Sequence, residues 1–245
     1  MDAQVIKADR AVRFFLSLAL FCNIAFWFLV RGEQARWTNI PPAPDKHFAA
    51  SYALGDAELS YRIIGLMIQN MGDYGGRTTS LADYDYHALA KWLFLEDFLD
   101  PHSDYVPYLA GYYFGSVQKP EEFRPVLGYL ETIGRRPEGE KWRWLLQAIW
   151  ITRFKLGDLD RAIELSYELA RVNNPNLPEW AHQMPAFVMN AKGEKEAAYA
   201  LMLQLLKTRG DRMDPTEVNA MRGYICEQIL SKQEAELNPL CKKLP

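Results

Sequence analysis

The sequence predicts an all-α protein with one N-terminal membrane helix. Three observations lead to this expectation: an uncharged apolar run near the N-terminus, helical spacing of apolar residues in the rest of the chain, and helix-start signals ahead of several helical stretches. The chain has 245 residues and a formal net charge of −3. Outside the apolar run, about 200 residues remain, enough for a single core or for a repeat array.

The apolar run covers residues 14–30 and has an arginine on each side, Arg13 and Arg31. As a helix it spans about 25 Å, near the lower limit for crossing a bilayer core. The main alternative is a cleaved signal peptide. The run is longer than the apolar part of a typical signal peptide, and no small-residue cleavage pattern follows it. We therefore expect a retained transmembrane anchor after a short N-terminal segment, 1–13.

The charges beside the run predict its orientation. Lys7, Arg10 and Arg13 lie on the short N-terminal side, whereas the basic residues beyond the run are spread over a longer segment. By the positive-inside rule, this favours a cytoplasmic N-terminus and an exported C-terminal domain. A protein of the cell inner membrane with a periplasmic domain fits best, and a eukaryotic organelle protein is the alternative.

One polar residue, Asn23, lies in the middle of the run. Because an unpartnered amide is costly in hydrocarbon, two interpretations are open. Asn23 either contacts the membrane helix of a partner protein, or it bonds to backbone or water. We treat it as a candidate partner-binding residue.

A proline-containing linker, 31–51, precedes the expected helical domain, 52–245. Its IPPAP motif favours an extended, semi-rigid spacer that would lift the domain off the membrane surface. Apolar spacing and Gly- or Pro-containing joints predict helices near 56–71, 81–99, 104–115, 121–133, 139–155, 159–172, 178–191, 194–208 and 215–232.

Helix-start signals support several of these bounds. Asp214 precedes Pro215, which gives a capping residue followed by a first-turn proline. Ser80 and Asn176 each precede an acidic residue by three positions, another N-terminal signature.

Small residues recur at a helical-repeat spacing. Gly157 and Gly193 lie roughly 36 residues apart, and each precedes an alanine by five positions, Ala162 and Ala198. Small residues of this kind let two helices approach closely while large residues fill the gaps. The pattern resembles the tetratricopeptide repeat family. Further residues at matching positions are Tyr61, Ile64, Gly65, Ile68, Gly72, Leu109, Ala110, Tyr113, Ala186, Met189, Met202 and Leu205.

The resemblance covers roughly residues 58–206. It implies an array of about four antiparallel helix pairs plus a C-terminal helix, with a long concave surface suited to protein partners. The sequence departs from the family pattern at Trp150, where a small residue is expected. It also has about eleven additional residues between Gly72 and Ala88.

This insertion, 73–87, is the most unusual soluble segment because it combines a Gly-Gly pair with contact-prone side chains. Long loops between repeat helices often lie on a functional rim. Tyr74, Arg77, Tyr84 and Tyr86 are therefore candidate partner-binding residues. The alternative is an ordered structural cap with its tyrosines packed inward.

The domain is rich in aromatic residues, and helical spacing predicts that most are core. Trp92 shares a face with other apolar residues, and so do Tyr105, Tyr112 and Tyr113. The alternative is that some of them line a concave face as binding anchors.

Signals for catalysis are missing. The sequence has no nucleophile elbow, phosphate-binding loop, zinc-protease motif or paired-cysteine motif, and its four histidines are scattered. We expect no enzyme activity, cofactor, metal or small-molecule substrate. Helix capping and turns explain the acidic residues and histidines between Asp83 and Asp104. The alternative is a helical enzyme with a site near His87 and His102. A pI near 5.9 gives no support for nucleic-acid binding.

Two cysteines lie in the expected domain, Cys226 and Cys241, and a third, Cys22, lies in the apolar run. In an exported domain, a disulfide between the first two would attach the C-terminal tail to the last helix. The alternative is two unrelated thiols.

Taken together, these features predict a membrane-anchored scaffold for protein–protein interaction, acting as an accessory or assembly subunit of a membrane or envelope complex. The expected partners are the lipid bilayer and one or more membrane proteins, contacted through the anchor and the helical array. A peptidoglycan- or lipid-binding envelope module is the alternative, and it would show a contiguous basic or aromatic surface patch.

Overall fold

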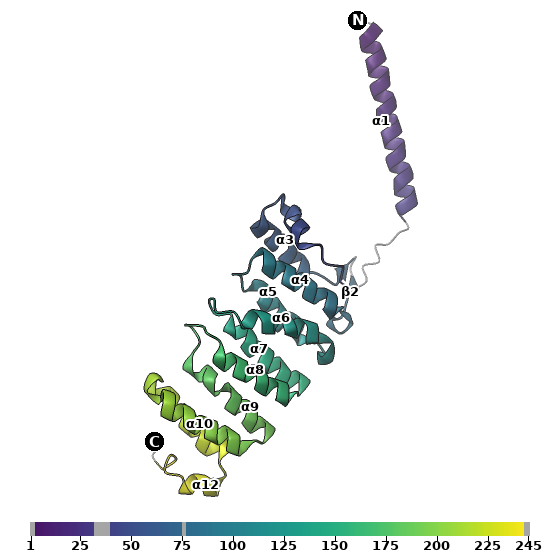
Figure 1. Cartoon of the computed structure of the whole chain (residues 1–245). Helices are drawn as coiled ribbons and strands as arrows, with labels where there is room; N and C mark the ends of the chain where they lie inside the picture. Colours follow the sequence, from purple (N-terminus) through teal and green to yellow (C-terminus); the bar gives the residue numbers. More distant parts are fainter. Residues whose placement is uncertain (1–2, 32–39, 75–76, 243–245) are drawn as a thin grey trace. The chain divides into compact units, whose positions relative to one another are not determined.

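The computed structural model describes residues 3–31, 40–74 and 77–242. The chain forms two compact units, Met1–Thr38 and Asn39–Pro245 (Figure 1).

The first unit is a single helix, α1 (Ala3–Val30). It contains the one candidate membrane span of the described residues, Val12–Leu29, with a mean hydropathy of 1.9. The side chains of this span are not buried within the structure. By length and composition, α1 is able to cross a membrane, as the sequence predicts.

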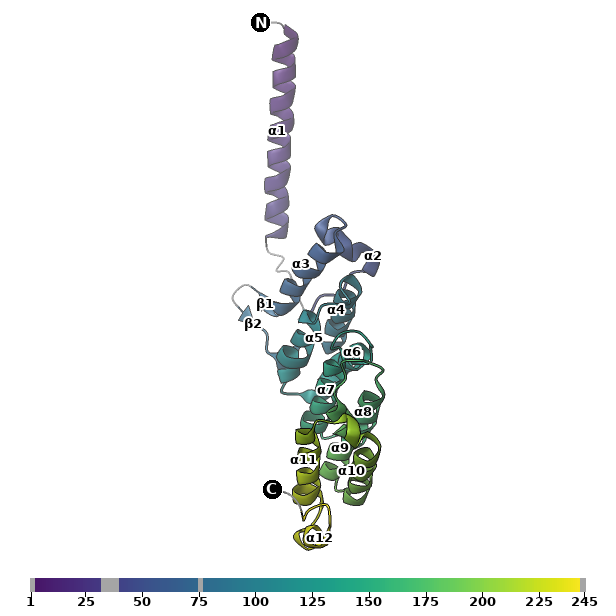
Figure 2. The ribbon, with the colours of Figure 1, turned by 90° about the vertical axis from the view of Figure 1, so that its left-hand side faces the viewer.

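The second unit is a stack of helices in two layers (Figure 2). One layer contains α3 (Ala57–Gln69), α5 (Tyr105–Tyr108), α7 (Trp142–Ile151), α9 (Met184–Lys192) and α11 (Pro215–Tyr224). The other layer contains α4 (Tyr86–Leu99), α6 (Arg124–Gly134), α8 (Leu159–Arg171) and α10 (Lys195–Arg209). Consecutive helices pack against each other, with the closest association between α6 and α7 and between α8 and α9.

Shorter elements extend and connect these helices. Three π-helical turns continue α5, α7 and α11: η3 (Leu109–Tyr113), η6 (Thr152–Leu156) and η9 (Ile225–Ile229). The 3-10 turns are η1 (Ala50–Ala53), η2 (Leu81–Asp83), η4 (Phe114–Ser116), η5 (Pro120–Phe123), η7 (Glu179–Gln183) and η8 (Gly210–Arg212). Two short helices, α2 (Lys46–Ala49) and α12 (Lys232–Leu237), lie near the ends of the unit.

The regular structure of the described residues is helical apart from one hairpin of two short strands. The predicted all-α class is therefore confirmed. The hairpin pairs β1 (Asp73–Tyr74) with β2 (Arg77–Thr78) in antiparallel orientation.

The capping signals differ in how well they predict helix starts. Asp214 caps α11 by accepting a hydrogen bond from the Thr216 amide at 2.8 Å, as predicted. Ser80 caps only the short η2, and α4 begins later behind its own cap, Asp85. The prediction at Asn176 is wrong, because η7 starts at Glu179 directly after a proline.

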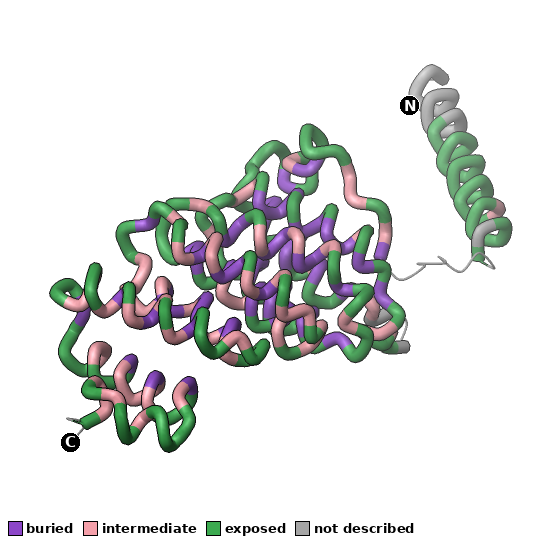
Figure 3. Tube along the Cα trace, turned by 60° about the horizontal axis from the view of Figure 1, so that its bottom comes forward, coloured by how far each residue is buried: buried purple, intermediate pink, exposed green. Residues whose placement is uncertain are grey.

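The interior separates into three hydrophobic clusters, and the buried residues lie mainly where helices face one another (Figure 3). The largest cluster extends from Ile40 to Ile151 and is rich in aromatic side chains. A middle cluster joins α7, α8 and α9. The third lies around α10 and α11 and contains several methionines, among them Met202, Met213 and Met221.

The segment after the anchor does not form the predicted spacer over its whole length. Ile40 and Ala49 are buried in the largest cluster, and the Trp92 indole donates a hydrogen bond to the Pro41 carbonyl at 2.7 Å. The prediction of a linker over 31–51 is therefore wrong from residue 40 onward. Burial of its apolar side chains holds this part on the domain, while 32–39 lies outside the described residues.

Candidate functional site

Two predicted partner-binding residues, Tyr84 and Tyr86, are buried in the largest hydrophobic cluster. The Tyr84 hydroxyl donates to the Met71 carbonyl, and the Tyr86 hydroxyl donates to the Leu81 carbonyl at 2.9 Å. At Gly72, where φ is +92°, a Cβ atom would lie 2.1 Å from the Tyr84 hydroxyl oxygen. The prediction that these tyrosines contact a partner is therefore wrong, and they form the inward-packed cap that the sequence left as the alternative.

The other predicted contact residues keep their status as predictions. Tyr74 and Arg77 lie in the β1–β2 hairpin, and their side chains are outside the described part of the structure. Asn23 donates from its amide nitrogen to the Ala19 carbonyl, 2.9 Å away in the same helix. The amide nitrogen of Asn23 is thus hydrogen-bonded within its own helix, without a partner protein.

Cys226 and Cys241 are joined by a disulfide with a Cα–Cα distance of 5.8 Å. Two hydrogen bonds hold the same tail: Arg222 donates to the Leu240 carbonyl at 2.7 Å, and Asn238 donates to the Tyr199 hydroxyl at 2.7 Å. The tail after α12 is therefore tied to the end of the stack.

The histidines of the alternative enzyme site are not brought together. His87 lines a surface depression with residues of η5 and α6, whereas His102 lines a different one beside Asp97 and Arg136. Among the described residues, no group of three or more acidic, histidine or cysteine side chains is placed to hold a metal ion.

The most distinctive exposed feature is a row of aromatic side chains on the layer formed by α3, α5, α7, α9 and α11. Tyr112 is 52% exposed and Trp150 is 46% exposed, unusually open for such large apolar groups. Tyr108 packs beside Tyr112 with ring centroids 5.0 Å apart, and Phe154 packs beside Trp150 at 5.6 Å. We call the surface of Tyr108, Tyr112, Trp150 and Phe154, with the depression between them, the aromatic groove.

The depression has a cavity volume of about 340 Å³ and lies between η3 and α7. Gly111 and Gly115 let the two helices approach here, since a Cβ atom at Gly111 would lie 2.9 Å from the Gln147 side chain. Gln147 donates to the Gly111 carbonyl at 3.1 Å, and Lys155 donates to the Gly115 carbonyl. The floor of the groove is therefore a tightly packed, hydrogen-bonded helix junction.

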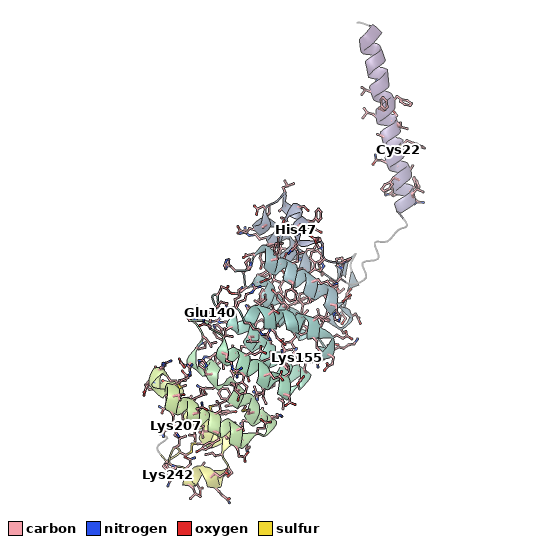
Figure 4. The ribbon with its side chains drawn as sticks, viewed as in Figure 1. Cys22, His47, Glu140, Lys155, Lys207 and Lys242 are labelled. Carbon is pink, nitrogen blue, oxygen red and sulfur yellow. A yellow bond between two sulfur atoms is a disulfide. The ribbon has the colours of Figure 1, made fainter. Side chains whose placement is uncertain are left out.

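The groove has a local positive charge without a matching acid. Arg153 lies 4.5 Å from the Phe154 ring centroid, and the Lys155 ammonium lies 6.0 Å from the Trp150 ring (Lys155 is labelled in Figure 4). Neither cation forms an ion pair with a described residue. In contrast, Arg136 and Lys141 are paired with Asp97 and Asp104 inside the domain.

Helical spacing predicts a core position for Tyr112 and Tyr113, and the structure shows why this prediction is wrong. Both residues lie in the π-helical turn η3, which adds a residue to the helical turn and rotates the following side chains. A second π-helical turn, η6, contains Phe154 on the other side of the groove. A π-helical turn has no reliable sequence signal, so spacing alone did not find the groove.

A buried acid, Glu96, lies on α4. Glu96 is fully buried, and neither carboxylate oxygen has a hydrogen-bond partner in the described chain. Burial, reinforced by the negative charge of Asp100, raises the pKa of Glu96 to about 9. A Cβ atom at Gly65 would lie 3.3 Å from this carboxylate and 3.2 Å from the Tyr105 ring, so Glu96 lies where α3, α4 and α5 meet. At neutral pH its side chain is a neutral acid.

No protein-family model matches the chain, and no curated protein or solved structure matches it.

Proposed function

We propose that this protein is a membrane-anchored scaffold that holds a protein partner in the aromatic groove. The observation that carries the proposal is the exposure of Tyr112 and Trp150 on either side of a depression. Two cations beside these rings, Arg153 and Lys155, form no ion pair with a described residue. Exposed aromatic anchors of this kind dominate the energetics of protein interfaces. The matching partner is a peptide segment that combines apolar side chains with a carboxylate.

The stack is, in this proposal, a degenerate tetratricopeptide-like array of about four helix pairs plus a C-terminal helix. Two observations support it. Gly157 and Gly193 end helices with φ of +67° and +92°, and Ala162 and Ala198, five residues later, are fully buried. An array of this type presents its first helices on one continuous surface, which is where the aromatic groove lies.

The anchor places this surface at a membrane. Tethering confines the domain and raises its effective concentration toward a membrane-bound partner, as an accessory or assembly subunit requires. The remaining acceptor of Asn23 is the group that would contact a partner's membrane helix.

We propose the inner membrane of a cell as the location, with the N-terminus in the cytoplasm and the domain in the periplasm. Lys7, Arg10 and Arg13 on the short flank support this orientation. The Cys226–Cys241 disulfide supports it as well, because such bonds persist in oxidising compartments. A protease added to spheroplasts is expected to digest the domain. Protection of the domain until the membrane is lysed would reverse the orientation.

Site-specific photo-crosslinking in native membranes tests the groove. A photoreactive phenylalanine analogue replaces Tyr112 or Trp150 in separate variants. The matched control carries it at Phe98, which is 56% exposed on α4 in the other layer. We expect one discrete protein adduct from both groove positions and none from the control.

A charge variant sharpens the same experiment. Arg153→Glu reverses one groove cation that has no ion pair to lose, so the fold is expected to persist. The adduct yield at Tyr112 should fall several-fold if the partner carries a carboxylate. Equal yields at the groove and control positions, or no groove adduct at all, would contradict the proposal.

A further inference from the structure

A second exposed apolar surface lies at the beginning of the stack. Its members come from α2, η1, the following turn and α3, and all are open to solvent: Phe48, Tyr52, Leu54, Leu59, Ile63 and Leu66. We call this surface the N-terminal apolar patch. Figure 4 labels its neighbour His47 at this end of the stack. A contiguous exposed apolar surface of this kind typically marks an interaction site.

The local structure explains how these side chains come to face outward. Ala49 and Ala53 are buried in the domain, whereas Phe48 and Tyr52, four residues apart on the α2–η1 segment, share a side that is exposed. On α3, residues 59, 63 and 66 follow a helical repeat and share one face. Because η1 packs on α3, the two groups belong to one end of the domain.

Leu54 is the most unusual member. It is 102% exposed, and its φ of 56° makes it the only non-glycine residue of the described chain in the left-handed region. A residue with a Cβ atom rarely adopts this conformation, and a leucine side chain gains nothing from water. Leu54 is thus unfavourable both in its backbone conformation and in the exposure of its side chain. This combination indicates a binding role.

Four charged side chains around the patch are already engaged within the domain. Glu58 pairs with Arg62. Asp45 accepts from the His47 amide at 2.8 Å and Asp56 accepts from the Leu59 amide at 3.0 Å, so both act as helix caps. Lys46 on α2 is the exception, with its ammonium 5.5 Å from the Phe98 ring centroid. The patch itself is apolar area, which suits an apolar medium better than a charged ligand.

We infer that the N-terminal apolar patch inserts into the interfacial region of the lipid bilayer, a step that rests on the proposed anchoring by α1. The length of the chain limits how far the domain can move from α1: the segment from Arg31 to Ile40 extends no farther than about 30 Å. The domain that carries the patch therefore stays tethered near any membrane that α1 crosses. Tyr52 is a residue type that favours the headgroup level, and Phe48 and the leucines are types that are buried just below it.

Fluorescence in reconstituted vesicles tests this inference. The full-length protein carries Leu54→Cys in a Cys22→Ser background, and the cysteine bears an environment-sensitive dye. Cys226 and Cys241 do not label because they are paired. In floated phosphatidylcholine vesicles we expect a blue-shifted emission that lipids with a nitroxide on the acyl chain quench. The control is Lys207→Cys, an exposed site on α10 (Figure 4), which should stay unshifted and unquenched.

A second probe position guards against a local artefact. Tyr52→Cys should show the same blue shift, and adding Leu54→Asp to that variant should reduce its quenching several-fold. Aqueous emission from position 54 in protein that floats with the vesicles would overturn the inference and leave the proposed anchor intact. Protein that does not float would overturn both. Protection of position 54 in native membranes but not in lipid vesicles would assign the patch to a protein partner and overturn the lipid assignment.

Discussion

The first and last parts of the helical stack are stabilised in different ways. The first part encloses Trp92, Phe114, Phe123 and Tyr129, all buried in one cluster. The last part encloses methionines and isoleucines, and it is closed by the Cys226–Cys241 disulfide. Methionine fills irregular gaps but specifies packing weakly. The end of the stack is therefore held by a covalent bond and by hydrogen bonds to its tail, whereas the beginning is held by large buried side chains.

The largest expected effect is in the first part. Trp92→Ala removes a buried indole and its hydrogen bond to Pro41. We expect unfolding free energy to fall by about 3–5 kcal/mol, because the cavity adds to the lost burial. Denaturant titration measures this, with Trp150→Ala, a half-exposed tryptophan, as the control that should change stability by about 1 kcal/mol or less. Equal losses in the two variants would contradict the assignment of Trp92 to the core.

The next effect tests the closure of the last part. Replacing Cys226 and Cys241 by serine opens a loop with a sequence separation of 15. A loop of this size is worth about 3 kcal/mol. Hydrogen exchange should show the loss at α11 and α12, with the first part unchanged. A uniform loss of protection along the whole stack would mean that the two parts unfold as one.

The buried acid of the first part makes a pH prediction. Because the pKa of Glu96 is raised from 4.5 to about 9, the folded state must keep a proton that the unfolded chain releases. The stability is therefore fully present below pH 4.5 and declines as pH rises toward 9, by about 1.4 kcal/mol per pH unit at most.

Glu96→Gln removes this proton linkage. We expect the variant to lose less stability than the parent between pH 5 and pH 8, and so to show a flatter pH profile of unfolding. Glu164→Gln, an exposed acid on α8, is the control. If the pH profiles of Glu96→Gln and the parent ran parallel, the ionised Glu96 carboxylate would have to be stabilised in the folded protein, which would contradict the prediction.

The smallest effect concerns α12. Ser231 accepts a hydrogen bond from the Glu234 amide at 3.4 Å, and the Glu234 carboxylate accepts hydrogen bonds from the serine amide and hydroxyl. Ser231→Ala should cost about 1 kcal/mol, visible as faster exchange of the α12 amides alone. Exchange faster throughout α10 and α11 would mean that this cap supports the whole end of the stack.

Features that depend on neighbours in sequence were predictable. The apolar run of α1 and the cap at Asp214 are local patterns, and the structure contains both. The helical class follows from spacing for the same reason. Helix bounds were less accurate where turns intervene, as at Ser80, which caps a single turn rather than the long helix expected.

Features that depend on tertiary contacts were not predictable. Tyr84 resembles an exposed contact residue in sequence, but the absence of a side chain at Gly72 makes room for its hydroxyl. Tyr112 follows core spacing until the π-helical turn rotates it outward. No local signal distinguishes Glu96 from a solvated helix acid, because its burial comes from α3 and α5.

The hydrogen bond between Trp92 and Pro41 has a mechanical consequence. Tension applied along the chain from α1 would arrive first at Ile40 and Pro41, which are fastened to α4. The load would therefore enter the aromatic-rich part of the stack, its strongest packed region, and would bypass the short helix α2. This attachment would protect the first helices of the stack from being pulled away by such a force.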